Sequence, residues 1–384
     1  MKTVGVICEY NPFHRGHWTQ FRQIRDFFGA DTAVICLMSG NFVQRGEPAV
    51  FDKLRRAAAA VDCGASLVLE LPVTGVLCSA EGFASCGVDI LDKLGAERLA
   101  FGCENGGTAD FLRLAEAMDT PEYDAALRAA LAGGMSYPAA RETAAKSLNL
   151  PGELLKTPNN ILGLEYCKAA LGRQIRPLAL HRAGDYHAQL PDWEAPSASS
   201  LRAVLAADGD IFPYLPQAAA RHFAGAERHF LHLGERAMLA RLRAMGKADW
   251  ERAAHGSEGL WSLAWRAAQM CGSLQEIENM VKSKRYPMSR IRRLLLCAYL
   301  GLTEADLRRE IPYVRALAMD ETGRRVLREM RKSTTFSMIN AGEKPDNMEY
   351  FELELRTAGL YGLFGEGEAC AAAEQLRRER IYLK

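Results

Sequence analysis

The sequence predicts an α/β fold: a doubly wound parallel sheet in residues 1–203, followed by a mainly α-helical C-terminal domain in residues 204–384. Two observations predict it. Before residue 203, short and almost wholly apolar runs alternate with helical patterns, which is typical of parallel strands buried on both faces. After that point the β-type runs fade and amphipathic helical patterns dominate.

Five apolar runs are the expected strands, and they span residues 3–8, 32–38, 66–71, 98–102 and 176–180. The segments between them read as helices, so each connection is a crossover between parallel strands. The longest connection contains an Ala-rich helical stretch with a Gly-Gly break. We expect that stretch to be a helical insertion at about 108–150, inside the first domain.

The composition sets limits on the class of protein. The chain has 384 residues, 48% of them hydrophobic and 25% charged, which suffices for a buried core without disulfides or a structural metal. It contains no apolar run of the ~18 residues that a membrane helix needs, and no secretory signal is evident. Its ten Cys form no CxxC pair, so buried thiols are expected rather than zinc ligands or disulfides. A cytoplasmic location is expected.

The strongest functional signal is the segment NPFHRGH at 11–17, directly after the first strand. Ligands of doubly wound sheets bind beyond the carboxyl ends of the strands. Pro12 fixes the entry geometry, Gly16 allows close approach to the backbone, and the next helix presents free N–H groups to an anion. His14 and His17 can then face one phosphate chain and stabilise its developing charge. A metal site is a poorer interpretation, because no third ligand is obvious nearby.

This segment resembles the HxGH signature of the nucleotidyltransferase superfamily, which includes class I tRNA synthetases and adenylyltransferases. Residues 5–17 (GVICEYNPFHRGH) and 38–49 (MSGNFVQRGEPA) together resemble the tRNA(Met) cytidine acetate ligase family. Further matches are LVLELP, FGCENG, PNNILGLE and KSKRYPMSRIRR, at 67–72, 101–106, 158–165 and 282–293. The absence of a KMSKS sequence counts against an ordinary class I synthetase.

The resemblance implies a Rossmann-like nucleotidyltransferase domain and a two-step reaction. ATP activates acetate as acetyl-adenylate and pyrophosphate is released. The exocyclic amine of the wobble cytidine in elongator tRNA(Met) then attacks the acetyl carbon, which gives N4-acetylcytidine without acetyl-coenzyme A. Mg²⁺ is expected to accompany ATP. The implied partners are tRNA and acetate, with no membrane and with the oligomeric state left open.

The resemblance also implies the site residues. His14 and His17 would be catalytic, and the ATP site would comprise Ile7, Cys8, Glu9, Tyr10, Asn11, Pro12, Phe13, His14, Arg15, Gly16, His17, Trp18, Thr19, Gln20, Gly102, Asn160 and Arg182. Alternatives remain open for several of them. Gly102 could instead serve a tight turn, Arg182 could form a surface ion pair, and Asn160 is not separated from Asn159. Glu104 could hold Mg²⁺ or the ribose, or be a solvated loop carboxylate.

Three further segments carry candidate phosphate or carboxylate contacts. A polar loop at 39–45 is expected over the substrate carboxylate or the phosphates. Lys53 and Arg56 begin the next helix, where they either neutralise phosphate or form an ordinary charged face. The Ser-rich segment at 197–202 resembles a late nucleotidyltransferase segment that holds phosphates, although simple helix capping explains it equally well.

A basic segment marks the C-terminal domain. Residues 281–332 contain 14 Lys or Arg against 6 Asp or Glu, a local net charge of +8 in a chain whose total is +1. Its most basic part has six cations and no acid at 282–293. With the resemblance, this predicts tRNA binding through Lys282, Lys284, Arg285, Arg290 and Arg293. Tyr286 is expected to stack on an unpaired base, although a solvated charged face would also explain the segment.

Two other functions remain open from the sequence. One is an adenylyltransferase that acts on a small phosphorylated cofactor precursor, which needs the HxGH site but not the basic helices. The other is a non-catalytic, nucleotide-sensing protein that binds RNA and releases no pyrophosphate. The full set of His14, Gly16 and His17 argues against the second. The residues that would hold acetate are not identifiable from the sequence.

Overall fold

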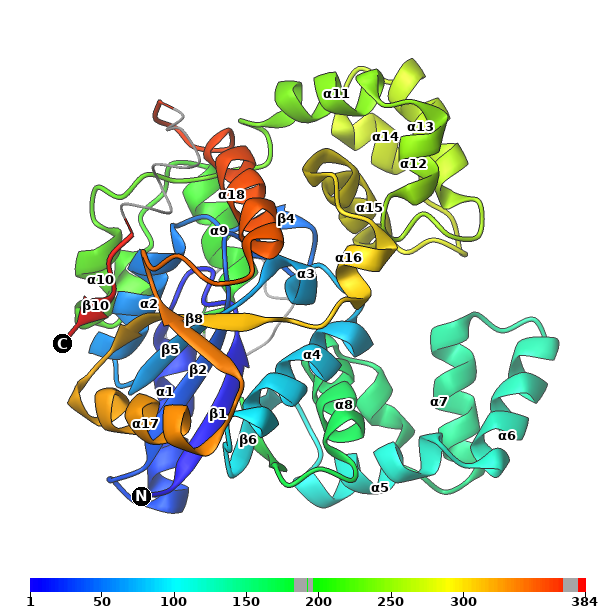
Figure 1. The fold of residues 1–384 in the computed structure, drawn as a ribbon. Helices are drawn as coiled ribbons and strands as arrows, with labels where there is room; N and C mark the ends of the chain where they lie inside the picture. The colour runs from blue at the N-terminus through cyan, green and yellow to red at the C-terminus, as the bar shows by residue number, and fades with distance from the viewer. Residues whose placement is uncertain (183–191, 193–195, 369–378) are drawn as a thin grey trace.

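The structure is a computed structural model that describes residues 1–182, 192, 196–368 and 379–384. Its main sheet has the strand order β10-β8-β5-β2-β1-β6-β7, with β9 paired to β8 (Figure 1). The five expected strands are all present and mutually parallel. They are β1 (Thr3–Cys8), β2 (Ala33–Ser39), β5 (Leu67–Leu71), β6 (Arg98–Cys103) and β7 (Arg176–His181).

The order of these five strands places a topological switch point between β1 and β6. From β1 the chain moves to one side through β2 and β5, and it then returns to β6 and β7 on the other side. The connection from β1 to β2 and the connection from β6 to β7 therefore run in opposite directions along the sheet. A crevice opens at the carboxyl ends of β1 and β6, where ligands of such sheets bind.

The sheet is buried on both faces because its strands alternate between two cores. Val4 and Val6 of β1 pack in one core, with Phe21 of α1 (Arg15–Phe28) and the Ala-rich face of α2 (Lys53–Asp62). Ile7 points to the other core, with side chains of α4 (Ala80–Lys93) and α8 (Pro158–Ala170). This confirms the doubly wound arrangement that the continuous apolar runs predict.

The helical insertion is also present. It consists of α5 (Thr108–Met118), α6 (Pro121–Ala132) and α7 (Tyr137–Ser147), which extend away from the sheet at the lower right of Figure 1. The short helices η1 (Gly152–Leu155) and α3 (Val73–Val76) complete this half of the molecule, and a small hairpin of β3 (Phe42–Val43) and β4 (Glu47–Pro48) follows β2.

The region after residue 203 is mainly helical, as expected. After α9 (Ala198–Ala206), η2 (Phe212–Tyr214) and α10 (Gln217–Phe223), six helices form a cluster with Trp250 in its core. They are α11 (Glu235–Ala244), α12 (Lys247–Arg252), α13 (Leu260–Met270), α14 (Leu274–Val281), α15 (Met288–Leu300) and α16 (Glu304–Arg308). No helix in the described ranges is long and apolar enough to cross a membrane.

The mainly helical region after residue 203 also contributes three strands to the main sheet. β8 (Tyr313–Met319) pairs antiparallel with β5, and β9 (Ser337–Asn340) and β10 (Tyr382–Leu383) pair parallel with β8. α17 (Glu321–Ser333) and α18 (Met348–Gly362) connect these strands. The C-terminal region is therefore not separate from the sheet. Its helical cluster lies outside the sheet, and the strands that follow the cluster extend the sheet beyond β5.

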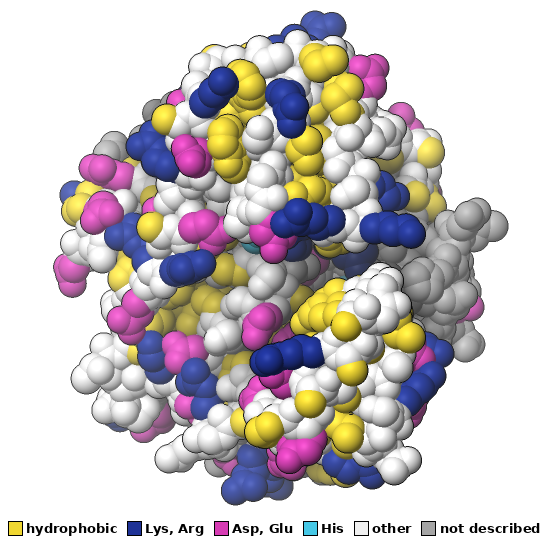
Figure 2. All heavy atoms as spheres, turned by 90° about the vertical axis from the view of Figure 1, so that its right-hand side faces the viewer, with side chains coloured by type: hydrophobic (Ala, Val, Ile, Leu, Met, Phe, Trp, Pro, Cys, Tyr) yellow, Lys and Arg dark blue, Asp and Glu magenta, His cyan; other side chains and the backbone are white. Residues whose placement is uncertain are grey.

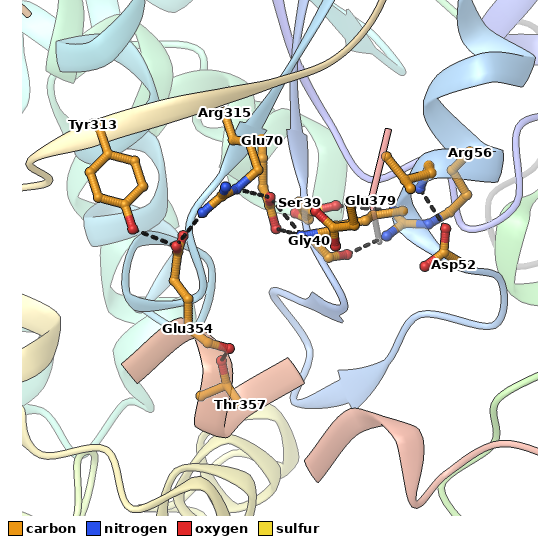
Figure 3. A network of polar contacts seen from close by, with 12 residues as sticks. Ser39, Gly40, Asp52, Arg56, Glu70, Tyr313, Arg315, Glu354, Thr357 and Glu379 are labelled. Carbon is orange, nitrogen blue, oxygen red and sulfur yellow. Dashed lines mark hydrogen bonds and ion pairs between the residues drawn. The ribbon is translucent and has the colours of Figure 1, made fainter. Parts of the chain in front are cut away.

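A buried network of charges fastens this returning segment to the sheet (Figure 3). The Lys53 ammonium lies 2.9 Å from Glu70 at the end of β5 and 3.0 Å from Glu379. Arg315 of β8 lies 2.6 Å from Glu354 of α18. Each buried charge thus has an opposite charge beside it, which offsets the cost of removing both from water.

Candidate active site

A cavity of about 520 Å³ opens at the carboxyl ends of β1 and β6, at the switch point of the sheet. Nine members of the predicted ATP loop line it: Ile7, Cys8, Glu9, Tyr10, Asn11, His14, Gly16, His17 and Gln20. The other five, Pro12, Phe13, Arg15, Trp18 and Thr19, are not part of its lining. Phe13 is instead fully buried in the core beside α1, where it packs against Phe21.

His14 and His17 form a stacked pair at the start of α1. Their ring centroids are 3.7 Å apart. His14 is the N-cap of the helix, and its Nδ1 accepts a hydrogen bond from the Gly16 N–H at 3.1 Å. In return, Nδ1 of His17 accepts from the His14 N–H at 3.3 Å. Because both Nδ1 atoms accept, each neutral ring carries its proton on Nε2.

The Nε2 proton of His14 is available to a ligand. His14 is fully buried and lines the cavity, yet its Nε2 atom has no hydrogen-bond partner in the described part of the chain. A buried donor without a partner is costly, so such an atom indicates a group that arrives with the ligand. The local sequence thus builds two aligned N–H donors at a helix N-terminus, which suits a phosphate.

Both imidazoles are held neutral. Burial, with the charges of Arg182 and Arg202, lowers the pKa of His14 to about 3. Burial, His14 and Arg182 lower the pKa of His17 well below its ordinary value. The pair is therefore suited to donating hydrogen bonds to charge that grows during reaction, and not to supplying fixed positive charge.

The depressed pKa values predict how stability depends on pH. In the unfolded chain, His14 takes up a proton near pH 6.5, whereas in the fold it does not until about pH 3. The unfolded state therefore binds more protons between these values, and stability falls as the pH drops below about 6.5. We expect a loss of about 2 kcal/mol from His14 at pH 5, measured by urea unfolding. His14→Asn keeps a capping side chain without titrating, so its decline should be shallower; equal declines would contradict the assignment.

Two arginines and the start of α9 complete the region around the histidines. Arg182, Ser199 and Arg202 all line the cavity. Arg202 donates to the Asn11 carbonyl at 3.0 Å, which fixes it against the HxGH loop. Ser197 caps α9 by accepting from the Ser200 N–H, so the capping interpretation of this segment is confirmed. Ser199 lies in the first turn of α9 and lines the cavity.

Gly102 provides space for Arg182. It lies within β6 opposite Leu180 of β7, so the alternative of a tight turn is wrong. A Cβ atom on Gly102 would lie 2.7 Å from Cδ of Arg182. Any side chain here would therefore displace the arginine from the cavity. Both residues line the cavity.

The structure separates Asn159 from Asn160. Asn159 lines the cavity and donates to Glu104, whereas Asn160 is fully buried and not in the lining. The Asn160 side chain accepts from the Glu104 N–H at 2.9 Å and also contacts Asn105. Asn160 thus supports the loop after β6. The Glu104 carboxylate is engaged by Thr157, Asn159 and the Asn160 N–H, so the solvated-loop alternative for it is wrong.

Arg56 holds the two loops that form the cavity wall. Its guanidinium is fully buried and donates to the carbonyls of Glu9, Ser39, Gly40 and Phe51 (Figure 3). With Lys53 held between Glu70 and Glu379, neither cation is on an exposed helix face, and neither lines the cavity. Neither phosphate neutralisation nor an ordinary charged helix face therefore describes Lys53 and Arg56.

The basic segment divides into exposed and buried parts. Lys282, Lys284 and Arg285 are exposed. Arg290 is paired at 3.0 Å with Glu258, and Arg293 is only 7% exposed and lines the cavity. The placement of Arg293 on an RNA-binding surface is thus corrected, because its helix turns it inward.

The prediction that Tyr286 stacks on an unpaired base is also corrected. Its ring is 5% exposed, and its hydroxyl donates to the Glu258 carbonyl at 2.6 Å. Arg285 and Arg290 lie over the ring. The tyrosine therefore supports the segment from inside and is not available to stack on a base.

A protein-built metal centre is absent from the described residues, where no three His, Cys, Asp or Glu side chains form a suitable group. Nine Cys lie in the described part of the chain and all are free thiols, and Cys370 lies outside it. Two carboxylates line the cavity. Glu47 is paired with Arg292, and burial raises the pKa of Glu9, which accepts from the Gln44 N–H at 2.7 Å.

Comparison with known proteins identifies the family. A model of the HIGH nucleotidyl transferases matches residues 1–375. Two tRNA(Met) cytidine acetate ligases are each 34% identical to this chain. The one from Acetivibrio thermocellus aligns over 366 residues, which cover 88% of both chains. The one from Geobacillus sp. (strain WCH70) aligns over 383 residues, which cover 94% of both chains. The chain belongs to the tRNA(Met) cytidine acetate ligase family. The resemblance of the HxGH and MSGNF segments is therefore confirmed.

Solved structures of this family share the whole fold. The crystal structure of apo TmcAL from Thermotoga maritima matches with a TM-score of 0.90 at 30% identity, and each chain covers 100% of the other. A second TmcAL structure from the same organism, bound with alpha-thio ATP, has a TM-score of 0.87 at 29% identity and the same coverage.

Several residues that line the cavity were not predicted as site residues, and two of them are polar residues from the helical region. Ser289 and Arg293 come from α15, far along the chain from the HxGH segment, and both line the cavity. The available signal was weak: Arg293 directly precedes the apolar run LLLCAYL, so it continues the buried face of the helix.

Proposed function

We propose that this chain is an ATP-dependent acetate ligase that forms N4-acetylcytidine at the wobble position of elongator tRNA(Met), through acetyl-adenylate. The observation that carries the proposal is the neutral His14–His17 pair, with the unpartnered Nε2 of His14 in a cavity at the switch point. The names of its relatives and the ATP analogue bound by the Thermotoga maritima structure support it.

In the first step, a carboxylate oxygen of acetate attacks the α-phosphorus of ATP and pyrophosphate leaves. Negative charge grows on the phosphate oxygens, so positioning and electrostatic stabilisation supply the catalysis. The Nε2 protons of the histidines, the guanidinium groups of Arg182 and Arg202, and the N–H groups at the start of α9 would provide it. Gly102 would keep room for the Arg182 side chain beside the nucleotide.

In the second step, the cytidine amine attacks the acetyl carbon and AMP leaves, while the amine loses a proton. The same hydrogen-bond donors would stabilise the departing phosphate. Mg²⁺ fits as an ion carried on the triphosphate, because Glu9 is the cavity carboxylate that remains free of an ion pair in the described residues. Such an ion commonly takes one or two carboxylates besides phosphate oxygens, and it would neutralise phosphate charge.

The helical C-terminal region would carry the tRNA. Figure 2 shows a hollow between the upper and lower parts of one face, with Lys and Arg side chains gathered above it. Lys282 and Lys284 are exposed and form no ion pair or hydrogen bond through their ammonium groups with any described residue. We assign residues 1–203, with the cavity residues of α15, to ATP-dependent chemistry, and the exposed cations after α14 to RNA contacts.

Charge reversal at Lys282 and Lys284 should separate RNA binding from ATP chemistry. We expect Lys282→Glu with Lys284→Glu to weaken tRNA binding and to lower the slope of log K against log salt by up to about 2, since each lost phosphate contact removes about 0.7–0.9. Acetate-dependent ATP chemistry without tRNA should be unchanged. Filter binding over a salt series tests this. An unchanged slope would place the RNA elsewhere.

Analysis of nucleosides tests the proposed function itself. Purified enzyme, tRNA(Met), ATP and ¹⁴C-acetate are incubated, and the digested tRNA is analysed by mass spectrometry. We expect labelled N4-acetylcytidine, and none when acetyl-coenzyme A replaces acetate and ATP. Transfer of AMP to a phosphorylated metabolite, without modified tRNA, would support the adenylyltransferase alternative. Binding of ATP and RNA without any product would support the nucleotide-sensing alternative.

A further inference from the structure

Arg293 is a buried cation with no counter-ion among the residues that the structure describes. Its side chain is 7% exposed, and its Nε atom has no hydrogen-bond partner among the described residues. One hydrogen bond is present, from Nη1 to the Gln44 carbonyl at 3.3 Å. Its titratable neighbours are the thiols of Cys78 and Cys297, the imidazole of His255 and the guanidinium of Arg290, and no carboxylate of the described chain forms an ion pair with it.

A guanidinium in this position is costly unless an anion joins it. Removing a charge from water is expensive, and burial lowers the pKa of Arg293 although the group remains protonated at any physiological pH. Other buried cations of the described chain are satisfied: Lys53 lies between two glutamates, Arg315 contacts Glu354, and the Arg56 guanidinium donates to four backbone carbonyls. Arg293 differs in one respect, because it lines the catalytic cavity. The missing anion is therefore expected from a substrate.

The surroundings of Arg293 fit a small carboxylate. The Gln44 amide donates to the Cys78 carbonyl at 3.3 Å, just before α4 begins, so Arg293, Gln44 and the start of α4 form one part of the wall. Val43, Ala80 and Phe83 add apolar surface to the same cavity. A planar guanidinium can bind a carboxylate through two parallel hydrogen bonds, and apolar neighbours suit a methyl group.

The position of Arg293 is fixed by the packing of α15. Gly46, with φ +82°, lies in the β3–β4 hairpin against the backbone of α15, and a Cβ there would lie 2.7 Å from the backbone of Arg292 and Arg293. The helix thus contacts the hairpin directly. This contact brings a residue from the helical cluster into the cavity of the sheet domain.

We propose that Arg293 binds the carboxylate of the acid substrate, in a subsite formed with the Val43–Gln44 backbone and the first turn of α4. The inference rests on the proposed acetate-ligase function and adds the residue that selects for a carboxylate. The phosphates of ATP already have Arg182, Arg202 and the histidine pair. The cytidine is uncharged and would leave Arg293 without a counter-ion.

Variants of Arg293 test the subsite through acetate-dependent pyrophosphate exchange without tRNA. We expect Arg293→Gln to raise the KM for acetate at least tenfold, with the KM for ATP and the Kd of ATP from equilibrium dialysis within twofold of the wild type. Arg293→Lys keeps the charge but loses the planar pair of N–H donors, so its KM for acetate should lie between those of the wild type and Arg293→Gln. Arg252→Gln is the matched control, because Arg252 is 69% exposed on α12.

A binding measurement without turnover accompanies the kinetics. Sodium acetate, compared with sodium chloride at equal ionic strength, should raise the Tm of the wild type and of Arg252→Gln but not that of Arg293→Gln. Without acetate, Arg293→Gln should melt no lower than the wild type, because the change removes an unpaired buried charge. If it does not fold, Arg293→Lys carries the kinetic test.

Three results would overturn the proposal. Weaker ATP binding at an unchanged KM for acetate would place a phosphate on Arg293. Unchanged ATP and acetate constants with slower transfer to tRNA would return it to RNA binding. Wild-type kinetics throughout would remove any role. A wild-type enzyme without acetate-dependent exchange would instead contradict the proposed function. That failure is distinguishable, because it is seen in the wild type alone, before any variant is compared.

Discussion

His17→Ala should lower the rate of adenylate formation by at least about 10²–10³-fold, the loss seen when one preorganised donor is removed from a developing charge. The Nδ1 atom of His17 is fixed by the His14 N–H, so its Nε2 proton is aligned beside that of His14. No other side chain of the first turn of α1 would replace it, since Trp18 is exposed. Pyrophosphate exchange at saturating ATP and acetate measures the effect.

The fold should tolerate the loss of His17. The side chain is half-buried and makes one capping hydrogen bond, so the free energy of unfolding should fall by about 1 kcal/mol. His17→Gln provides a residue type that capping boxes carry at this position, and should restore stability without activity. Asp26→Ala, on the exposed part of the same helix, should change neither. Full activity of His17→Gln would remove the histidine from the chemistry.

Arg56→Leu should lower the free energy of unfolding by about 3–5 kcal/mol, because it leaves four buried carbonyls without their donor and each such group costs about 1–3 kcal/mol. The loss of the guanidinium's own desolvation cost offsets part of this sum. Two of the four carbonyls belong to Glu9 and Gly40, in the loops directly after β1 and β2. Adenylate formation should therefore fall strongly even where the protein remains folded.

Urea unfolding and exchange at low temperature separate the two effects of Arg56. Arg55→Leu is the matched control, since Arg55 is exposed and donates to one carbonyl, of His222, at 3.2 Å. It should cost less than about 1 kcal/mol and leave the rate unchanged. Arg56→Lys should recover only part of the stability, because one ammonium cannot reach all four carbonyls. Equal stability of the Arg55 and Arg56 variants would show that the clamp does not hold the loops.

The strands of the first domain were predictable because their signal is local. Each is a continuous apolar run, and observed ends such as Ala33–Ser39 differ from the expected 32–38 by one residue. β8 was missed because Arg315 interrupts its apolar run within a strongly basic stretch. Only the tertiary structure shows that Glu354 neutralises this arginine and makes a buried strand possible.

The site divides in the same way. The HxGH loop was predictable because strand, turn and helix start are contiguous in the sequence. Asn159 and Asn160 could not be separated, because a one-residue difference at a helix start decides which side chain faces the cavity. Arg293 was assigned to RNA because it belongs to a run of six cations without an acid at 282–293. Its neighbours in space are Gln44 and Cys78, and no local pattern indicates that contact.

Pyrophosphate exchange into ATP, with and without acetate and in the absence of tRNA, tests the central claim most directly. We expect exchange that requires acetate, saturates with it and disappears in His17→Ala. Exchange that is independent of acetate, or that appears only with a phosphorylated metabolite, would contradict the assignment of this cavity to acetate activation.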